Sequence, residues 1–215
     1  MKKLFISLLF ACLAMPSAIQ AQELSKSAEK AIKKEVSTKM KELKKGKWEV
    51  FDTSHSMERA LWKHYEKLEK GEDKVFDMIG YATAKSKNLA STAALASACN
   101  RYATQASTRV IGKLISELEN NGTNNNEDLE KFRATFLSEV EKDIRGDLHL
   151  SFGVIRKNEK NGTYEVQVYY IVDQEAASRS RLRALEIAEK EAQFSENIKK
   201  IVKETAEESF VPSNE

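Results

Sequence analysis

The sequence predicts an α+β domain in which helices pack on an antiparallel sheet of about four strands. Three observations support this fold class. Residues 148–172 alternate apolar and polar side chains on both sides of an Asn-Gly pair, which is typical of a β-hairpin. Apolar residues recur at helical spacing over residues 24–45 and in several later segments. Residues 87–119 are rich in alanine, which predicts a central helix packed close to its neighbours.

The first 21 residues are expected to be a signal peptide. Lys2 and Lys3 precede an apolar stretch over 4–14 and a region of small residues that ends at Ala21, where cleavage is expected. The apolar stretch is shorter than the roughly 20 residues that span a bilayer. No later segment is both long and uncharged enough to do so. We therefore expect a periplasmic or secreted protein without a transmembrane segment.

The two cysteines bear on anchoring and on disulfides. A lipid anchor needs a cysteine at the cleavage point, and Cys12 is the only candidate. Phe10 is bulky where a lipobox has a small residue, so we expect ordinary cleavage rather than a lipid anchor at Cys12. Cleavage leaves Cys99 alone, which excludes an internal disulfide. Its place in the alanine-rich segment favours a buried thiol.

The charge of the mature chain is balanced. Removal of Lys2 and Lys3 from the 35 basic residues leaves 33, against 33 acidic residues. Nucleic-acid binding needs a strong basic excess, so we expect no nucleic-acid partner. Residues 24–47 nevertheless carry nine lysines and three glutamates. A solvated helix face is the favoured interpretation of this segment, and a basic patch facing anionic lipid or polysaccharide is the alternative.

The mature chain is expected to form one domain over 22–210, with a helical extension at 22–46 and a disordered tail at 211–215. Within it, the apolar spacing predicts a first helix over 24–45 that ends at Gly46. The next elements are expected to be a short strand at 48–51, a helix from Met57 to Gly71 and a strand at 75–84.

A helix is then expected over 87–119, because small residues recur every four positions from Ala90. Small side chains around most of its girth would let this helix lie close to a sheet on one side and a helix on the other. An Asn-rich loop follows, and then a helix over 127–145 that stops at Gly146. The last element is expected to be one long helix over 174–209, bent near 193–197.

The hairpin loop sets the strand register. A three-residue loop over 160–162, with Gly162 in the left-handed conformation, places the apolar sets of the two strands on one face. In this register Phe152 pairs with Tyr170, and Val154 pairs with Val168.

The other face of the hairpin is expected to be polar with an apolar island. Ile155, Tyr169 and Ile171 lie there among polar residues. The Tyr169 ring falls opposite Gly153, and a ring beside a strand glycine is usually a local repair of the sheet. An apolar island on a polar face is also how a contact surface begins, so these three residues are the candidate binding residues. The basic face of the first helix is a weaker candidate.

Catalytic motifs are scarce. A metal site or a hydrolytic site could be built from Asp52, His55, Glu58 and His64. The spacing of these residues, however, matches no closed zinc pattern. His64 lies on the apolar face of its helix, where histidines usually pack. The sequence holds no GxSxG, P-loop or GxGxxG motif. We therefore name no catalytic residue, no metal and no cofactor.

Three segments carry a family resemblance: Gly80-Tyr81-Ala82, the alanine-rich Ala90–Ala96 and the strand Gly162–Val168. Over about 75–172, the chain resembles the bacterial surface-lipoprotein family that also includes the amino-terminal domain of flagellar assembly protein T. The segments around Gly46-Lys47-Trp48 and Met57–Leu61 resemble uncharacterised exported proteins of gut-type anaerobic bacteria. The resemblance implies an α+β envelope protein that binds or assembles, and it transfers no catalytic residues.

We therefore expect an exported, envelope-associated binding or assembly module without catalytic activity. Its expected partner is an envelope protein or a second copy of the chain. The alternative is a periplasmic hydrolase or metal-dependent enzyme built on the Asp52–His64 region.

Overall fold

The computed structural model describes residues 24–51, 53–120, 126–190, 196–208 and 210–212. Within these residues the chain forms six α-helices and one four-stranded sheet. The strand order is β1-β3-β4-β2, and every neighbouring pair is antiparallel. The fold is therefore α+β, as the sequence predicts. The elements are α1 (Lys26–Lys45), β1 (Glu49–Phe51), α2 (Met57–Gly71), the 3₁₀ turn η1 (Glu72–Lys74), β2 (Val75–Ala84), α3 (Lys87–Asn120), α4 (Asn126–Asp147), β3 (His149–Asn158), β4 (Thr163–Asp173), α5 (Gln174–Ala188) and α6 (Glu196–Glu207).

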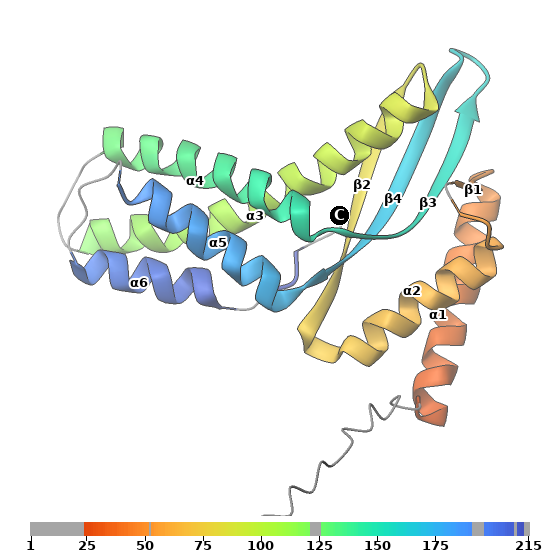
Figure 1. Ribbon diagram of the computed structural model, residues 1–215, viewed down its shortest axis with the longest axis horizontal. Helices are drawn as coiled ribbons and strands as arrows, with labels where there is room; N and C mark the ends of the chain where they lie inside the picture. The colour runs from red at the N-terminus through yellow and green to blue at the C-terminus, as the bar shows by residue number, and fades with distance from the viewer. Residues whose placement is uncertain (1–23, 52, 121–125, 191–195, 209, 213–215) are drawn as a thin grey trace, which may run out of the picture.

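Helices cover both faces of the sheet (Figure 1). On one face, α1 and α2 pack over Ile79, Phe152 and Tyr169. On the other face, the first half of α3 packs over strands β2 and β4. The second half of α3 runs beyond the sheet, where it packs with α4, α5 and α6 (Figure 1). The basic helix α1 thus lies at the opposite end of the molecule from the α4–α6 bundle.

Side-chain caps fix where several helices begin. The Ser25 hydroxyl accepts a hydrogen bond from the backbone N–H of Ala28 at the start of α1. Ser56 accepts one in the same way from Arg59 at the start of α2. The Asp173 carboxylate begins α5 by accepting from two backbone N–H groups. Each cap satisfies a donor that the first turn of a helix leaves without an intrahelical partner.

The hairpin register differs from the expected one by a residue. Asn158 lies opposite Thr163, so the loop spans 159–162 rather than 160–162. Gly162 is left-handed with a φ of 69°, as expected. Phe152 therefore pairs with Tyr169 rather than Tyr170, and Val154 pairs with Gln167 rather than Val168. A bulge between Leu150 and Phe152 shifts the register once more.

The carboxy-terminal segment forms two helices where one long, bent helix is expected. Helix α5 ends at Ala188, and α6 begins at Glu196 and runs back along α5 (Figure 1). The Arg181 guanidinium on α5 donates to the carbonyls of Ala206 and Glu208, which ties the end of α6 to the middle of α5. Helix α4 also differs slightly, because it runs through Gly146 to Asp147.

Some expectations fall outside the described residues. The signal peptide at 1–21, Cys12 and residues 213–215 of the tail are among them. Cys99 is buried, as expected.

Candidate functional site

The expected apolar island on the sheet is not an exposed surface. Ile155, Tyr169 and Ile171 are only 7, 2 and 8% exposed. Tyr169 stacks on Phe152 at 4.2 Å beneath α1 and α2, and Ile155 lies on the opposite face with the α3 core. The prediction of an exposed island was wrong because it assumed an open sheet face and a register that placed the three residues together.

The four residues of the alternative enzymatic hypothesis do not form one cluster in the described structure. Asp52 lies outside the described residues. His55 lies beside Lys63, with 2.9 Å between its Nε2 and the Lys63 Nζ, and this ammonium lowers the pKa of His55. Glu58 faces α1, whereas His64 is buried against the sheet. The described residues hold no group of three or more histidine, cysteine or acidic side chains placed to bind a metal ion.

His64 instead joins two residues that are distant in sequence. Its Nδ1 lies 3.1 Å from the Ser151 hydroxyl, and its Nε2 lies 3.7 Å from an Asp77 carboxylate oxygen. A hydroxyl, an imidazole and a carboxylate in this order resemble the components of a nucleophilic site. The imidazole, however, is 1% exposed and is packed edge-on against the rings of Phe152 and Tyr169. The contacts explain how α2 is fastened to the sheet.

A groove with a volume of about 780 Å³ lies between α1 and α2. This size falls in the range of roughly 300–1,000 Å³ that is usual for small-molecule sites. We call it the α1–α2 groove. It is lined by Lys26, Glu29, Lys30, Lys33, Val36, Ser37, Met40, Lys41 and Lys44 from α1, and by Glu58 and Trp62 from α2.

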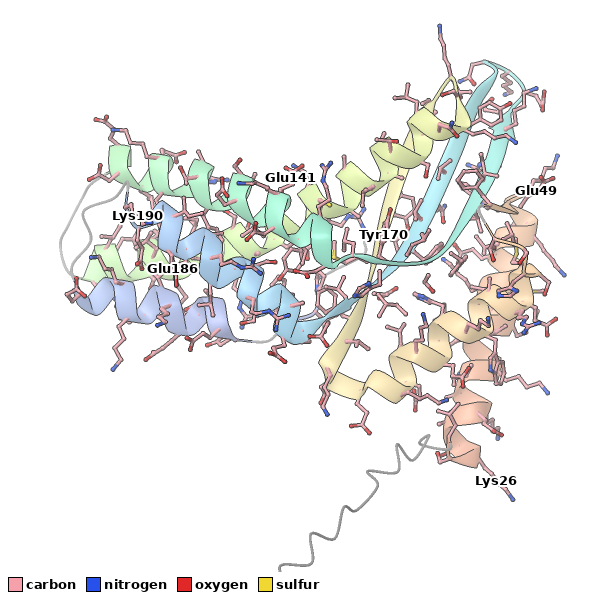
Figure 2. All side chains as sticks on the ribbon, viewed as in Figure 1. Lys26, Glu49, Glu141, Tyr170, Glu186 and Lys190 are labelled. Atoms are coloured by element: carbon pink, nitrogen blue, oxygen red, sulfur yellow. The ribbon has the colours of Figure 1, made fainter. Side chains whose placement is uncertain are left out.

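Lysine dominates the charge of the α1–α2 groove. Five lysines and two glutamates line it, which gives five minus two, or three positive charges in excess. None of these five lysines forms an ion pair with a described residue, whereas Lys39 on another face of α1 pairs with Glu42 at 2.8 Å. Figure 2 shows the Lys26 side chain pointing away from the protein at the amino-terminal end of α1. The groove therefore keeps an excess of positive charge, which Glu29 and Glu58 offset only in part.

The floor of the groove is apolar. Val36 is buried, and Met40 and Trp62 are half-buried, so part of each of the larger two side chains faces the groove. Lys33 precedes this floor along α1, and Lys41 and Lys44 follow it. Residues three and four apart are neighbours on a helix surface, so lysines lie at both ends of the floor. Such a site can hold a ligand that combines an acidic group with an apolar part.

The sequence singled out the lysines of this groove, with a solvated helix face as the favoured interpretation and an anion-facing basic patch as the alternative. The lysine excess of residues 24–47 indicated a basic face. The contribution of Trp62 and Glu58 was missed, because no local pattern shows which side of α2 meets α1.

Among the described residues, no helix combines the length and the apolar character needed to cross a membrane. Comparison with known proteins adds no assignment: no protein family, no curated protein and no solved structure matches the chain.

Proposed function

We propose that the protein is an exported, non-enzymatic binding module of the cell envelope that binds an anionic envelope component in the α1–α2 groove. One observation carries this proposal: five lysines that form no ion pair with a described residue, against two glutamates, surround an apolar floor in the α1–α2 groove. Positive charge in a recessed site attracts anions and favours their retention.

The surroundings of the candidate catalytic residues support a non-enzymatic role. His64 has a hydroxyl and a carboxylate beside it, but aromatic rings seal its imidazole from solvent. A general base must lie within hydrogen-bond reach of the proton that it removes. That proton belongs either to the substrate or to a nucleophile that contacts the substrate. His55 lies beside Lys63, and Glu58 lines the α1–α2 groove, so neither adjoins His64.

Export and envelope association rest on the sequence. Residues 1–21 have the charge and apolar pattern of a signal peptide. The resemblance to surface lipoproteins and to the amino-terminal domain of flagellar assembly protein T agrees with a binding role in the envelope. Binding of a partner protein or of a second copy would have to use a surface other than Ile155, Tyr169 and Ile171, since these are buried.

Neighbouring lysine pairs on α1 allow a matched test. Lys33 and Lys44 line the groove, whereas Lys34 and Lys45 follow them directly in the sequence, are exposed and do not line it. The variants K33E/K44E and K34E/K45E therefore change the net charge equally. Sedimentation with phosphatidylglycerol vesicles, with phosphatidylcholine vesicles as the neutral control, measures lipid binding. Binding to dextran sulfate measures attraction to a soluble polyanion.

We expect binding to at least one anionic probe, weakened by salt and absent with the neutral vesicles. K33E/K44E should weaken this binding at least about tenfold, because each lysine near an anionic surface contributes about 1 kcal/mol. K34E/K45E should have a clearly smaller effect. Equal loss in the two variants, or no binding of any anionic probe, would refute the proposal.

A further inference from the structure

We infer that the ligand of the α1–α2 groove is a single anionic lipid molecule, with an acyl chain on Val36, Met40 and Trp62 and its phosphate beside the lysines. This inference rests on the proposed function and specifies its ligand class. It follows from the order of side chains along the groove, from the nature of its walls and from the type of basic residue.

The order of side chains suits a molecule with a charged end and an apolar chain. Along α1, Lys30 and Lys33 precede the apolar floor, and Lys41 and Lys44 follow it. The span from Lys26 to Lys44 is 18 residues, or about 27 Å of helix at 1.5 Å per residue. A soluble polyanion would use the lysines and leave the floor exposed to water. An acyl chain covers the floor, and each buried CH₂ group is worth about 0.8 kcal/mol.

The floor residues are suited to a flexible chain. Methionine is unbranched and adapts its shape to irregular apolar surfaces. Tryptophan combines a large apolar ring with one polar N–H, as at membrane interfaces. The indole N–H of Trp62 has no hydrogen-bond acceptor among the described residues, so it is available to a lipid oxygen.

The walls favour a lipid over an acidic peptide. Both walls are α-helices, whose backbone N–H and C=O groups bond within the helix. An extended peptide therefore finds no strand edge in the groove on which to add main-chain hydrogen bonds. A docked helix would insert a row of apolar anchors, three and four residues apart, into an apolar groove. The floor of this groove offers only three apolar side chains to receive them.

The basic side chains that line the groove are all lysines. Arginine recognises carboxylate or phosphate through a rigid two-pronged geometry, whereas lysine acts as a mobile point charge. Five mobile charges around a groove tolerate a phosphate in several positions while the chain stays on the floor. The volume of about 780 Å³ suits one molecule.

Trp62 provides a direct probe of the floor. The chain has two tryptophans, so the substitution W48F leaves Trp62 as the only one. Trp48 lies under the Arg156 guanidinium at 4.5 Å and does not line the α1–α2 groove. Monomeric lysophosphatidylglycerol with a brominated chain, below its micelle concentration, is titrated into the W48F protein. Bromine quenches indole fluorescence only on close approach, so quenching reports a chain on the floor.

We expect saturable quenching of at least half of the Trp62 emission. K33E/K44E should raise the lipid concentration that gives half-maximal quenching at least tenfold. K34E/K45E should leave this concentration within about threefold of the parent value. Brominated lysophosphatidylcholine with the same chain should need at least a tenfold higher concentration for the same quenching. Glycerol phosphate, which lacks the chain, should not compete with the lipid at equal concentration. Circular dichroism of each variant verifies that the fold is retained.

The outcomes separate the two claims. If anionic probes bind with the dependence on Lys33 and Lys44 while Trp62 is not quenched, the lipid inference fails and the proposed function stands. Equal quenching by the phosphatidylcholine analogue, or displacement of the lipid by an acidic polyglutamate peptide at lower concentration, would also overturn the inference. If no anionic probe binds in a groove-dependent way, both claims fail.

Discussion

Gly80 on β2 lies directly beneath the backbone carbonyl of Ala94 on α3, so close that a Cβ at residue 80 would stand 1.9 Å from the Ala94 oxygen. This contact explains why α3 carries so few large side chains over its first half. Ala90, Ala94 and Ala98 are all fully buried, and their small size lets the helix backbone approach the strand. The alanine-rich pattern predicted such an approach from the sequence.

Gly80→Ala should therefore destabilise the protein. The added methyl group forces α3 away from β2, and overpacking of this kind costs about 1–3 kcal/mol. Gly112→Ala is the matched control, because a Cβ at residue 112 of α3 meets nothing within 4 Å. Alanine is the better helix former by up to about 1 kcal/mol, so this control should be neutral or stabilising. Urea unfolding measures both, and equal effects of the two would contradict the account.

Arg181→Met should destabilise the carboxy-terminal helices. The Arg181 side chain is 1% exposed and donates to the Ala206 and Glu208 carbonyls and to the Tyr102 hydroxyl. Loss of these bonds leaves buried acceptors unpaired, at a cost of about 2–4 kcal/mol. Limited proteolysis should then cut first within 196–208.

Arg183→Met provides the comparison, since Arg183 is exposed and reaches Asp143 only at 3.6 Å. We expect Arg183→Met to lower the free energy of unfolding by at most about 1 kcal/mol. An Arg181→Met protein as stable as Arg183→Met would show that the end of α6 is held by other contacts.

Ser151→Ala should lower stability without affecting ligand binding. It removes the 3.1 Å contact with the buried His64 imidazole, and a lost hydrogen bond of this kind costs about 1–2 kcal/mol. Ser54→Ala, at an exposed position, should change stability by less than about 0.5 kcal/mol. Thermal unfolding and vesicle sedimentation of both variants test this. A hydrolytic activity of the parent protein that Ser151→Ala abolishes would contradict the structural role.

The protein should lose stability at alkaline pH. Burial raises the pKa of Tyr65 from an ordinary value of 10.0 to about 12, with a smaller contribution from the Glu35 carboxylate. Because the folded state holds the Tyr65 proton more tightly than the unfolded state, this contribution to stability is complete below pH 10. It is lost as the pH rises from about 10 to about 12.

Tyr65→Phe should make the free energy of unfolding fall less steeply over this pH range, although Tyr170, whose pKa burial also raises to about 12, still contributes. Urea unfolding at a series of pH values measures the slope. An unchanged slope in the variant would contradict the assignment to Tyr65.

The sequence predicted the elements better than their arrangement. The apolar segment at 75–84 was identified as a strand although it alternates less cleanly than the hairpin, and apolar spacing with Gly46 at its end identified the first helix. The hairpin register was missed because helices cover both faces of the sheet. Phe152 and Tyr169 on one face and Val166 and Val168 on the other are all buried, so the apolar pattern does not choose between registers that differ by one residue.

The division between α5 and α6 was missed because apolar residues continue at helical spacing on both sides of it. The interaction that folds the two helices together is the Arg181 contact with carbonyls 25 and 27 residues away, which no local pattern shows. The candidate site was predictable only where its residues follow a local pattern. The lysines of the α1–α2 groove follow one another along a single helix, whereas Trp62 joins them only through packing of α2 on α1.

Position-specific photo-cross-linking in living cells tests the central claim most directly. A photoreactive amino acid replaces Ser37, which lines the α1–α2 groove, or its neighbour Thr38, which is exposed and does not line it. We predict that residue 37 becomes linked to an acidic or phosphate-bearing envelope molecule, that K33E/K44E abolishes the adduct, and that residue 38 gives none. Equal adducts from both positions, or an adduct at residue 37 that persists in K33E/K44E, would contradict binding of an anionic component in this groove.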